Sequence, residues 1–287
     1  MNNEEEVIIS LMADLEKNCG NTGGSDSDGG RKYESLIELW RLEGIACSTV
    51  GASKIQDDSK SRWYRTAKEY WEDERNCPPT VDGVLGGFAS ISDMDLVASE
   101  HFLSELKSMR PSFRTTDGAC VDCGAGIGRI SKGLLLPLGF KRCDLVEVSP
   151  RLISAAPEYL GNSLADRCRY LCIGLQDFEP KENTYDLIWI QWVVGYLTDG
   201  DCLRFLKRCA ASLTEGGVLC IKDNICDGEN AFVVDKDDCS LIRSLPYLLT
   251  LCKYAGLEVV YQKVQNDFPD EIFPVPILAL ERNTTKN

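Results

Sequence analysis

Short runs of apolar residues alternate along the chain with longer stretches in which apolar positions recur every three or four residues. The apolar runs predict strands at residues 119–122, 144–148, 170–173, 185–191, 218–223, 257–265 and 277–281. The stretches with helical spacing predict helices at residues 129–138, 150–160, 199–213 and 241–255, with a turn at residues 215–217. Because strands and helices alternate, the pattern predicts an α/β fold with a doubly wound sheet that binds ligands at the carboxyl ends of its strands. The run 185–191 is apolar almost throughout, so we expect it at the centre of a parallel sheet.

The beginning of the chain differs in composition from the remainder. Residues 1–30 hold seven acids and one base, and residues 18–30 are almost all small or polar, as in a flexible linker. Aromatic and small residues then follow at helical spacing, namely Trp63, Tyr64, Ala67, Tyr70 and Trp71. We therefore expect an acidic, partly disordered extension over residues 1–61 and a folded domain over residues 62–287 that begins with a helical segment.

Charge and hydropathy limit the partners of the chain. With 31 basic and 45 acidic residues the formal net charge is −14, which disfavours a sequence-independent grip on nucleic acid and suits cationic ligands. No apolar run reaches the ~20 residues of a membrane span, and Met1 is followed by polar and acidic residues rather than by a signal peptide. We expect a monomeric enzyme of the cytoplasm or nucleus that binds neither membranes nor nucleic acids.

Cysteine and histidine usage argues against disulfides and metal sites. The fourteen cysteines are spread over the chain, and several lie in the predicted strands, where a thiol behaves as a small apolar side chain. Cys120 and Cys123 form a Cys-x-x-Cys pair, but alternation along a strand would point them to opposite faces of the sheet. His101 is the only histidine and lies in a stretch of helical spacing. We expect no metal and no Ser-His-Asp triad.

A glycine-rich turn after the first predicted strand is the most informative motif. Residues 121–129 read VDCGAGIGR, and glycines at such a turn let the backbone approach a ligand closely. Glu147 ends the second strand, where its carboxylate can accept hydrogen bonds from ribose hydroxyls, so the motif predicts a nucleoside cofactor. The spacing Gly-x-Gly-x-Gly departs from the dinucleotide fingerprint Gly-x-Gly-x-x-Gly, and Asp122 at the strand end suits a cation better than a pyrophosphate. The motif resembles that of S-adenosylmethionine-dependent methyltransferases, with a dehydrogenase as the alternative.

Further motifs resemble the protein α-N-terminal methyltransferases. They are residues 78–87 (PPTVDGVLGG), 174–178 (GLQDF), 188–192 (IWIQW), 221–224 (IKDN) and 269–272 (PDEI). The resemblance covers about residues 63–282 and implies a seven-strand Rossmann-like fold. It also implies transfer of methyl groups from S-adenosyl-L-methionine to the free α-amine of proteins that begin Xaa-Pro-Lys or Xaa-Pro-Arg, with S-adenosyl-L-homocysteine as the product.

The resemblance also implies the site residues. The implied cofactor-binding residues are Gly124, Gly126, Arg129, Glu147, Val148, Ser149, Leu175, Gln176 and Gln191. The implied substrate-binding residues are Trp71, Leu85, Ile91, Trp192, Asp235, Ser240, Ile272 and Phe273, and the implied catalytic residues are Asp238, Asn224 and Tyr196. Several have structural alternatives: core packing for Leu85 and Ile91, a strand-end cap for Gln191, and a solvated acidic loop for Asp235 and its neighbours.

Two positions depart from the family pattern. Tyr196 stands where the family commonly has a histidine, and Phe273 replaces a tyrosine. A tyrosine with a pKa near 10 is a poor general base at neutral pH, so we expect catalysis to depend more on Asp238. Two other functions stay open: methylation of another amine, on a small metabolite or a lysine side chain, and a weakly active module that binds protein N-termini.

Overall fold

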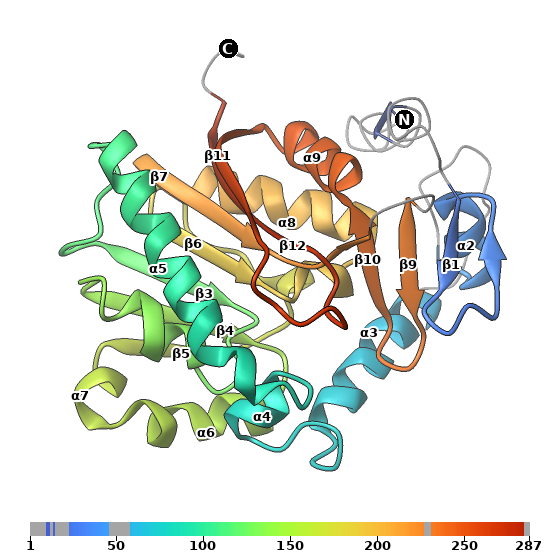
Figure 1. Ribbon diagram of the computed structural model, residues 1–287, viewed down its shortest axis with the longest axis horizontal. Helices are drawn as coiled ribbons and strands as arrows, with labels where there is room; N and C mark the ends of the chain where they lie inside the picture. The colour runs from blue at the N-terminus through green and yellow to red at the C-terminus, as the bar shows by residue number, and fades with distance from the viewer. Residues whose placement is uncertain (1–9, 12–13, 15–22, 46–57, 227–230, 284–287) are drawn as a thin grey trace.

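Two sheets organise the protein (Figure 1). The computed structural model describes residues 10, 11, 14, 23–45, 58–226 and 231–283. The larger sheet has seven strands in the order β11-β12-β7-β6-β3-β4-β5. They are β3 (Ala119–Cys123), β4 (Arg142–Glu147), β5 (Cys168–Cys172), β6 (Tyr185–Gln191), β7 (Leu213–Lys222), β11 (Leu257–Gln265) and β12 (Val275–Arg282). Strands β3 to β7 are parallel, β12 pairs antiparallel with β7, and β6 is central and fully buried, which confirms the predicted α/β fold.

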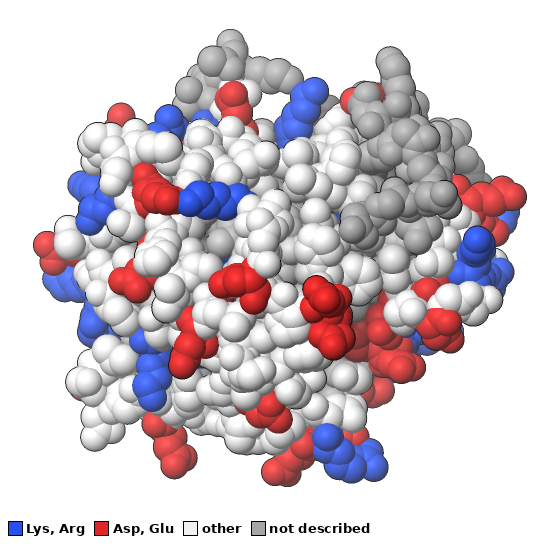
Figure 2. Space-filling model, viewed as in Figure 1, with Lys and Arg blue, Asp and Glu red and all other residues white. Residues whose placement is uncertain are grey.

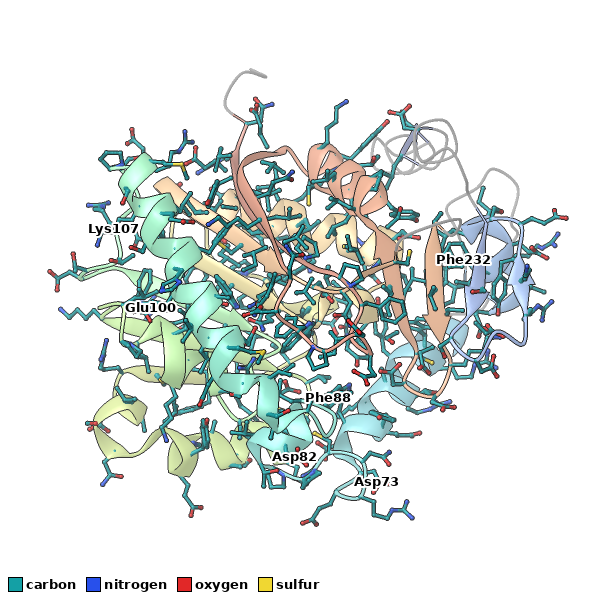
Figure 3. The ribbon with its side chains drawn as sticks, in the orientation of Figure 1. Asp73, Asp82, Phe88, Glu100, Lys107 and Phe232 are labelled. Carbon is teal, nitrogen blue, oxygen red and sulfur yellow. The ribbon has the colours of Figure 1, made fainter. Side chains whose placement is uncertain are left out.

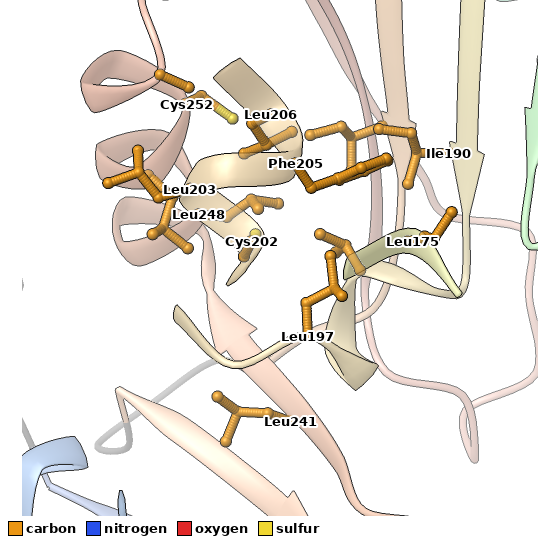
Figure 4. Packing of buried hydrophobic residues seen from close by; sticks show 14 of the residues in the cluster. Leu175, Ile190, Leu197, Cys202, Leu203, Phe205, Leu206, Leu241, Leu248 and Cys252 are labelled. Carbon is orange, nitrogen blue, oxygen red and sulfur yellow. The ribbon is translucent and has the colours of Figure 1, made fainter. Parts of the chain in front are cut away.

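Helices cover both faces of this sheet. One face packs against α5 (Ser92–Met109), η2 (Ser131–Leu135), α6 (Pro150–Leu160) and α7 (Asn162–Ala165). The other packs against α8 (Asp199–Ser212) and α9 (Leu245–Tyr254), and residues of α2 (Leu36–Leu42) and α3 (Asp58–Glu72) belong to the same hydrophobic core. Figure 4 shows Leu203 and Leu206 of α8 facing Leu248 and Cys252 of α9. Cys120 and Cys123 belong to cores on opposite faces, as predicted. No helix in the described part of the chain has the length and apolar character needed to cross a bilayer.

The structure corrects the predicted elements between β6 and β11. Residues 241–244 were expected in a helix but belong to β10 (Ser240–Ser244), because Leu241 and Arg243 alternate as buried positions and pair with a neighbouring strand. Helix α9 begins only at Leu245, with a proline in its first turn. The expected turn at 215–217 lies within β7, where Gly216 has φ +76° and the register to β6 shifts.

A smaller sheet departs from the prediction, because part of the expected flexible linker is a strand. Its order is β2 (Lys32–Tyr33), β1 (Gly24–Asp26), β9 (Phe232–Asp235), β10 and β8 (Ile225–Cys226). Strand β1 runs parallel to β9, and Tyr33 and Trp40 behind it are buried. Residues 24–26 are therefore ordered by a partner more than 200 residues away, which local composition does not reveal.

Short helical segments complete the architecture near the carboxyl ends of the parallel strands. They are α4 (Val81–Val84), η1 (Ala89–Ile91), η3 (Leu175–Asp177) and η4 (Val194–Tyr196). The predicted helix after the glycine-rich turn is present as η2, wound as a π-helix. Helix α3 begins at Asp58, four residues before the expected start of the domain.

The packing of α2 yields a stability prediction. Trp40 is buried, and its indole N–H donates to Asp199 Oδ2 at 2.7 Å. Trp40→Phe keeps an aromatic ring but leaves this buried carboxylate oxygen without its donor, so we expect the free energy of unfolding to fall by about 1–3 kcal/mol. Urea unfolding measures the change, with Leu42→Ala as a control on the exposed side of the same helix. Equal stability of wild type and Trp40→Phe would show that α2 is not coupled to the domain.

Candidate functional site

A cavity opens at the carboxyl ends of β3, β4 and β6. It brings together twelve of the residues that the sequence implied: Trp71, Leu85, Gly124, Gly126, Arg129, Glu147, Val148, Leu175, Gln176, Gln191, Trp192 and Tyr196. Tyr64, Ala67 and Lys68 of α3 also line it. The location is the expected one for ligands of a doubly wound sheet.

The glycine-rich turn forms the floor of the cavity. The N–H groups of Gly124 and Ala125 both donate to the carbonyl of Val146, at 2.8 and 3.0 Å, which holds the turn against the end of β4. Gly124 has φ +74°, and a Cβ there would lie 2.7 Å from Cβ of Val193. No other residue type fits this position without displacing the wall of the cavity.

The carboxylate of Glu147 faces the turn from the end of β4. Its Oε2 accepts from the N–H of Gly126 at 3.0 Å, and its Oε1 accepts from the N–H of Ser149 at 2.8 Å. Burial raises the pKa of Glu147, and these two backbone donors oppose the rise. A carboxylate has about four acceptor positions, so capacity is left for a ligand hydroxyl in the cavity.

Asp122 and Ser149 also have structural partners. Asp122 Oδ2 accepts from the N–H and the hydroxyl of Ser131, at 3.0 and 2.7 Å, and burial raises the pKa of Asp122 to about 6. Asp122 lines the cavity as well, so this carboxylate both borders the cavity and holds the start of η2. Ser149 caps α6 by accepting from the N–H of Leu152 at 3.1 Å and also bonds to Glu72.

A buried ion network centred on Asp95 supports the cofactor side of the cavity. Asp95 is fully buried and pairs with Arg129 at 2.7 Å and with the fully buried Lys222. Gln191 donates its amide to both oxygens of Asp95, at 2.8 and 3.0 Å, and accepts from the indole N–H of Trp189 at 2.9 Å. Burial lowers the pKa of Lys222, and Asp95 opposes that change. Asp95 was not predicted from the sequence, because it is one acid among several in the stretch that forms α5.

Aromatic side chains form the opposite wall. The rings of Trp71 and Tyr196 meet edge to face with centroids 6.0 Å apart. Trp192 has φ +51°, a left-handed conformation that is rare for an aromatic residue. Directly after it, the N–H groups of Val193 and Val194 both donate to Asp223 Oδ2, at 3.1 and 3.0 Å. This anchor holds the strained turn, and burial raises the pKa of Asp223 to about 6.

Asp238 and Tyr196 form a hydrogen-bonded pair next to this wall. The phenol of Tyr196 donates to Asp238 Oδ2 at 2.8 Å, while Asp238 Oδ1 and Asn224 Oδ1 are buried without a hydrogen-bond partner among the described residues. Burial, followed by the charge of Asp238, raises the pKa of Tyr196 well above its usual value. Burial also raises the pKa of Asp238, with Asp235 adding to the rise and Ser240 opposing it. Tyr196 therefore stays protonated and acts as a donor, and the carboxylate of Asp238 is the member of the pair that can accept a proton.

The remaining implied residues are not among those that line this cavity. Ile91 is buried, Asp235 and Ser240 flank the turn between β9 and β10, and Ile272 and Phe273 line a second hollow in the loop 265–274. Figure 2 shows acidic side chains gathered where the β9–β10 turn and the β11–β12 loop lie in Figure 1. Among the described residues, no group of three or more His, Cys, Asp or Glu side chains is arranged to hold a metal ion.

Known proteins resemble this chain over most of its length. The family model described as AdoMet dependent proline di-methyltransferase matches residues 59–281. N-terminal Xaa-Pro-Lys N-methyltransferase 1-A of Xenopus laevis is 43% identical over 223 residues, which cover 78% of this chain and 97% of that protein. Alpha N-terminal protein methyltransferase 1 of Dictyostelium discoideum is 40% identical over 287 residues, with 98% of both chains covered.

A solved structure agrees with these relatives. A SAM-dependent methyltransferase of Leishmania major superposes with a TM-score of 0.76 and 34% identity, covering 91% of this chain and 96% of that one. The family match spans the glycine-rich turn, the Asp95 network and the Asp238–Tyr196 pair described above. The chain therefore belongs to the family of AdoMet-dependent proline di-methyltransferases.

Proposed function

We propose that this enzyme transfers methyl groups from S-adenosyl-L-methionine to the free α-amine of proteins that begin Xaa-Pro-Lys or Xaa-Pro-Arg. The observation that carries the proposal is Asp238 Oδ1, which is buried without a hydrogen-bond partner among the described residues, while Oδ2 accepts from Tyr196 at the aromatic wall. Such an oxygen lacks a donor, and an α-ammonium group supplies one. The names of the Xenopus and Dictyostelium relatives support the same substrate class.

The residues of the cavity fit the cofactor. Gly124 leaves space that a Cβ would fill, Glu147 retains acceptor capacity for ribose hydroxyls, and Arg129 keeps N–H groups beyond its contact with Asp95 for a carboxylate. Leu175 and Gln176, which follow β5, are suited to the adenine. When bound, S-adenosylmethionine supplies an electrophilic sulfonium methyl group.

The substrate peptide would enter along the aromatic wall. Trp71, Trp192 and Tyr196 offer an apolar surface for the second-position proline, with Leu85 and Ile91 packed behind. Asn224 Oδ1 is a buried acceptor for a backbone N–H of the peptide, and Asp235 and Ser240 face the third-position cation. Ile272 and Phe273 bound the outer end of this path.

Asp238 removes the proton that blocks the reaction. A peptide α-amine has a pKa near 8, so it arrives largely protonated at neutral pH. The raised pKa of Asp238 brings the carboxylate closer to the pKa of the amine, which favours proton transfer. Holding the neutral amine in line with the methyl group then supplies orientation, the other main contribution of the protein.

We also infer that the enzyme works in a reducing compartment, the cytoplasm or the nucleus, as a single chain acting on proteins. The cysteines that the structure describes are free thiols, which supports a reducing compartment.

Mass spectrometry tests the function directly. A Ser-Pro-Lys peptide incubated with enzyme and cofactor should gain mass in steps of one methyl group at its N-terminus, whereas an N-acetylated copy should gain none. A Ser-Pro-Gln peptide should react more slowly, because it lacks the third-position cation. Methylation of the acetylated peptide at its lysine would instead assign the enzyme to side-chain amines.

Cofactor binding provides a second prediction. Gly124→Val should abolish binding of S-adenosylmethionine by filling the floor of the cavity, and Glu147→Ala should weaken it by about 1–3 kcal/mol through loss of the ribose acceptors. Isothermal titration calorimetry measures both. Unchanged affinity in the two variants would show that the cofactor does not bind in this cavity.

Steady-state kinetics separates the roles of the acidic residues. Asp238→Asn keeps the shape of the side chain but cannot take the proton, so kcat should fall by about 10²–10⁴. Asp235→Asn should mainly raise KM for the lysine peptide, and Tyr196→Phe should have a milder effect than either. Only the ionised carboxylate of Asp238 can accept a proton. The kcat of the wild-type enzyme should therefore increase as the pH rises through the raised pKa of Asp238, and Asp238→Asn should not show this increase. If Tyr196→Phe had no turnover while Asp238→Asn stayed active, the assignment of Asp238 as the proton acceptor would be wrong.

A further inference from the structure

The segment 23–45 lies outside the residues that match the family but is built into the substrate side of the site. The family match begins at residue 59, whereas β1 pairs with β9 in the register Gly24 to Phe232 and Asp26 to Val234. A Cβ on Gly24 would lie 2.5 Å from the ring of Phe232, which Figure 3 shows beside β1. The close approach of the two strands therefore depends on a glycine at this position.

This pairing carries the segment to the acidic turn between β9 and β10. The N–H of Ser27 donates to the carbonyl of Val234 at 2.8 Å, and its hydroxyl donates to Asp235 Oδ2 at 3.1 Å. The N–H of Asp237 donates to Asp235 Oδ1 at 2.9 Å. Asp235 is thus held in one orientation from both sides.

The same segment also restrains the one base in the turn. Residues 235–240 contain three acids and a single cation, Lys236. The ammonium of Lys236 lies 3.3 Å from Glu43 Oε1 and 5.6 Å from the centre of the Tyr33 ring. Both partners belong to segment 23–45, so the segment directs this cation away from the acids beside it in the chain.

We infer that segment 23–45 is a specificity element, in which Ser27 orients Asp235 and Glu43 withdraws Lys236 so that Asp235 stays available for the third-position cation of the substrate. The inference rests on the proposed function. A lysine ammonium on its flexible stem would otherwise compete with the substrate for the neighbouring carboxylate. Glu43 and Ser27 act through Asp235 and Lys236 and are positioning residues.

Two variants that break the same ion pair should behave differently. In Glu43→Gln, Lys236 is released toward Asp235, so KM for a Ser-Pro-Lys peptide should rise about two- to fivefold, the scale of one exposed ion pair. In Lys236→Gln the competing cation is absent, so KM should stay at or below the wild-type value. The double variant should behave like Lys236→Gln. Glu43 also contacts Arg62 at 3.4 Å, so Arg62→Gln controls for the loss of that contact and should leave KM unchanged.

The experiment measures kcat and KM of these four variants and wild type on Ser-Pro-Lys and Ser-Pro-Gln peptides, with thermal unfolding to check the fold. The expected result is a loss of preference for lysine in Glu43→Gln, with little change on the glutamine peptide, and its recovery in the double variant. Equal KM increases in Glu43→Gln and Lys236→Gln, or an unchanged lysine preference in Glu43→Gln, would overturn the inference. A wild-type enzyme that methylates neither peptide would contradict the proposed function itself.

Discussion

The part of the cavity that Arg129 and Gln191 line depends on one buried carboxylate, Asp95. Its two oxygens meet the guanidinium of Arg129, the ammonium of Lys222 and the amide of Gln191, and all four side chains are buried. They belong to α5, the helical segment after the glycine-rich turn, the end of β7 and the end of β6. Two buried cations would be unstable without this charge, so the network fixes the relative positions of the elements around the cavity.

The substrate side is organised differently, by a strained turn and a hairpin. Asp223 anchors the backbone after Trp192, whose φ is +51°, and the hairpin of β9 and β10 carries Asp238 to Tyr196. Burial at this end of the sheet raises the pKa of Asp223 and of Asp238 alike. Desolvation destabilises the ionised form of a carboxylate, and at Asp238 it brings the pKa closer to that of the amine that this residue is proposed to deprotonate. The proposed chemistry therefore depends on the burial of Asp238, because burial raises the pKa of its carboxyl group.

The local sequence pattern was sufficient to predict the strands of the large sheet, but it did not predict the strands of the small sheet. The strand 185–191, the glycine turn and Glu147 were predictable because apolar runs and glycines at strand ends act within a few residues. Twelve residues that the family resemblance implied meet in one cavity, although their roles stay predictions. Residues 24–26 and 241–244 were mispredicted because each becomes a strand by pairing with β9, and Asp95 was missed because its role depends on cations brought from other elements.

Equilibrium unfolding of Asp95→Asn is the measurement that tests the central claim most directly. The substitution keeps the side-chain shape but leaves Arg129 and Lys222 buried without a counter-charge. The account predicts a loss of about 3–5 kcal/mol in the free energy of unfolding, with weakened binding of S-adenosylmethionine. Asp93→Asn is the matched control, because Asp93 lies exposed in the same helical turn and should leave both quantities unchanged. Equal stability and cofactor affinity for Asp95→Asn and wild type would contradict the account.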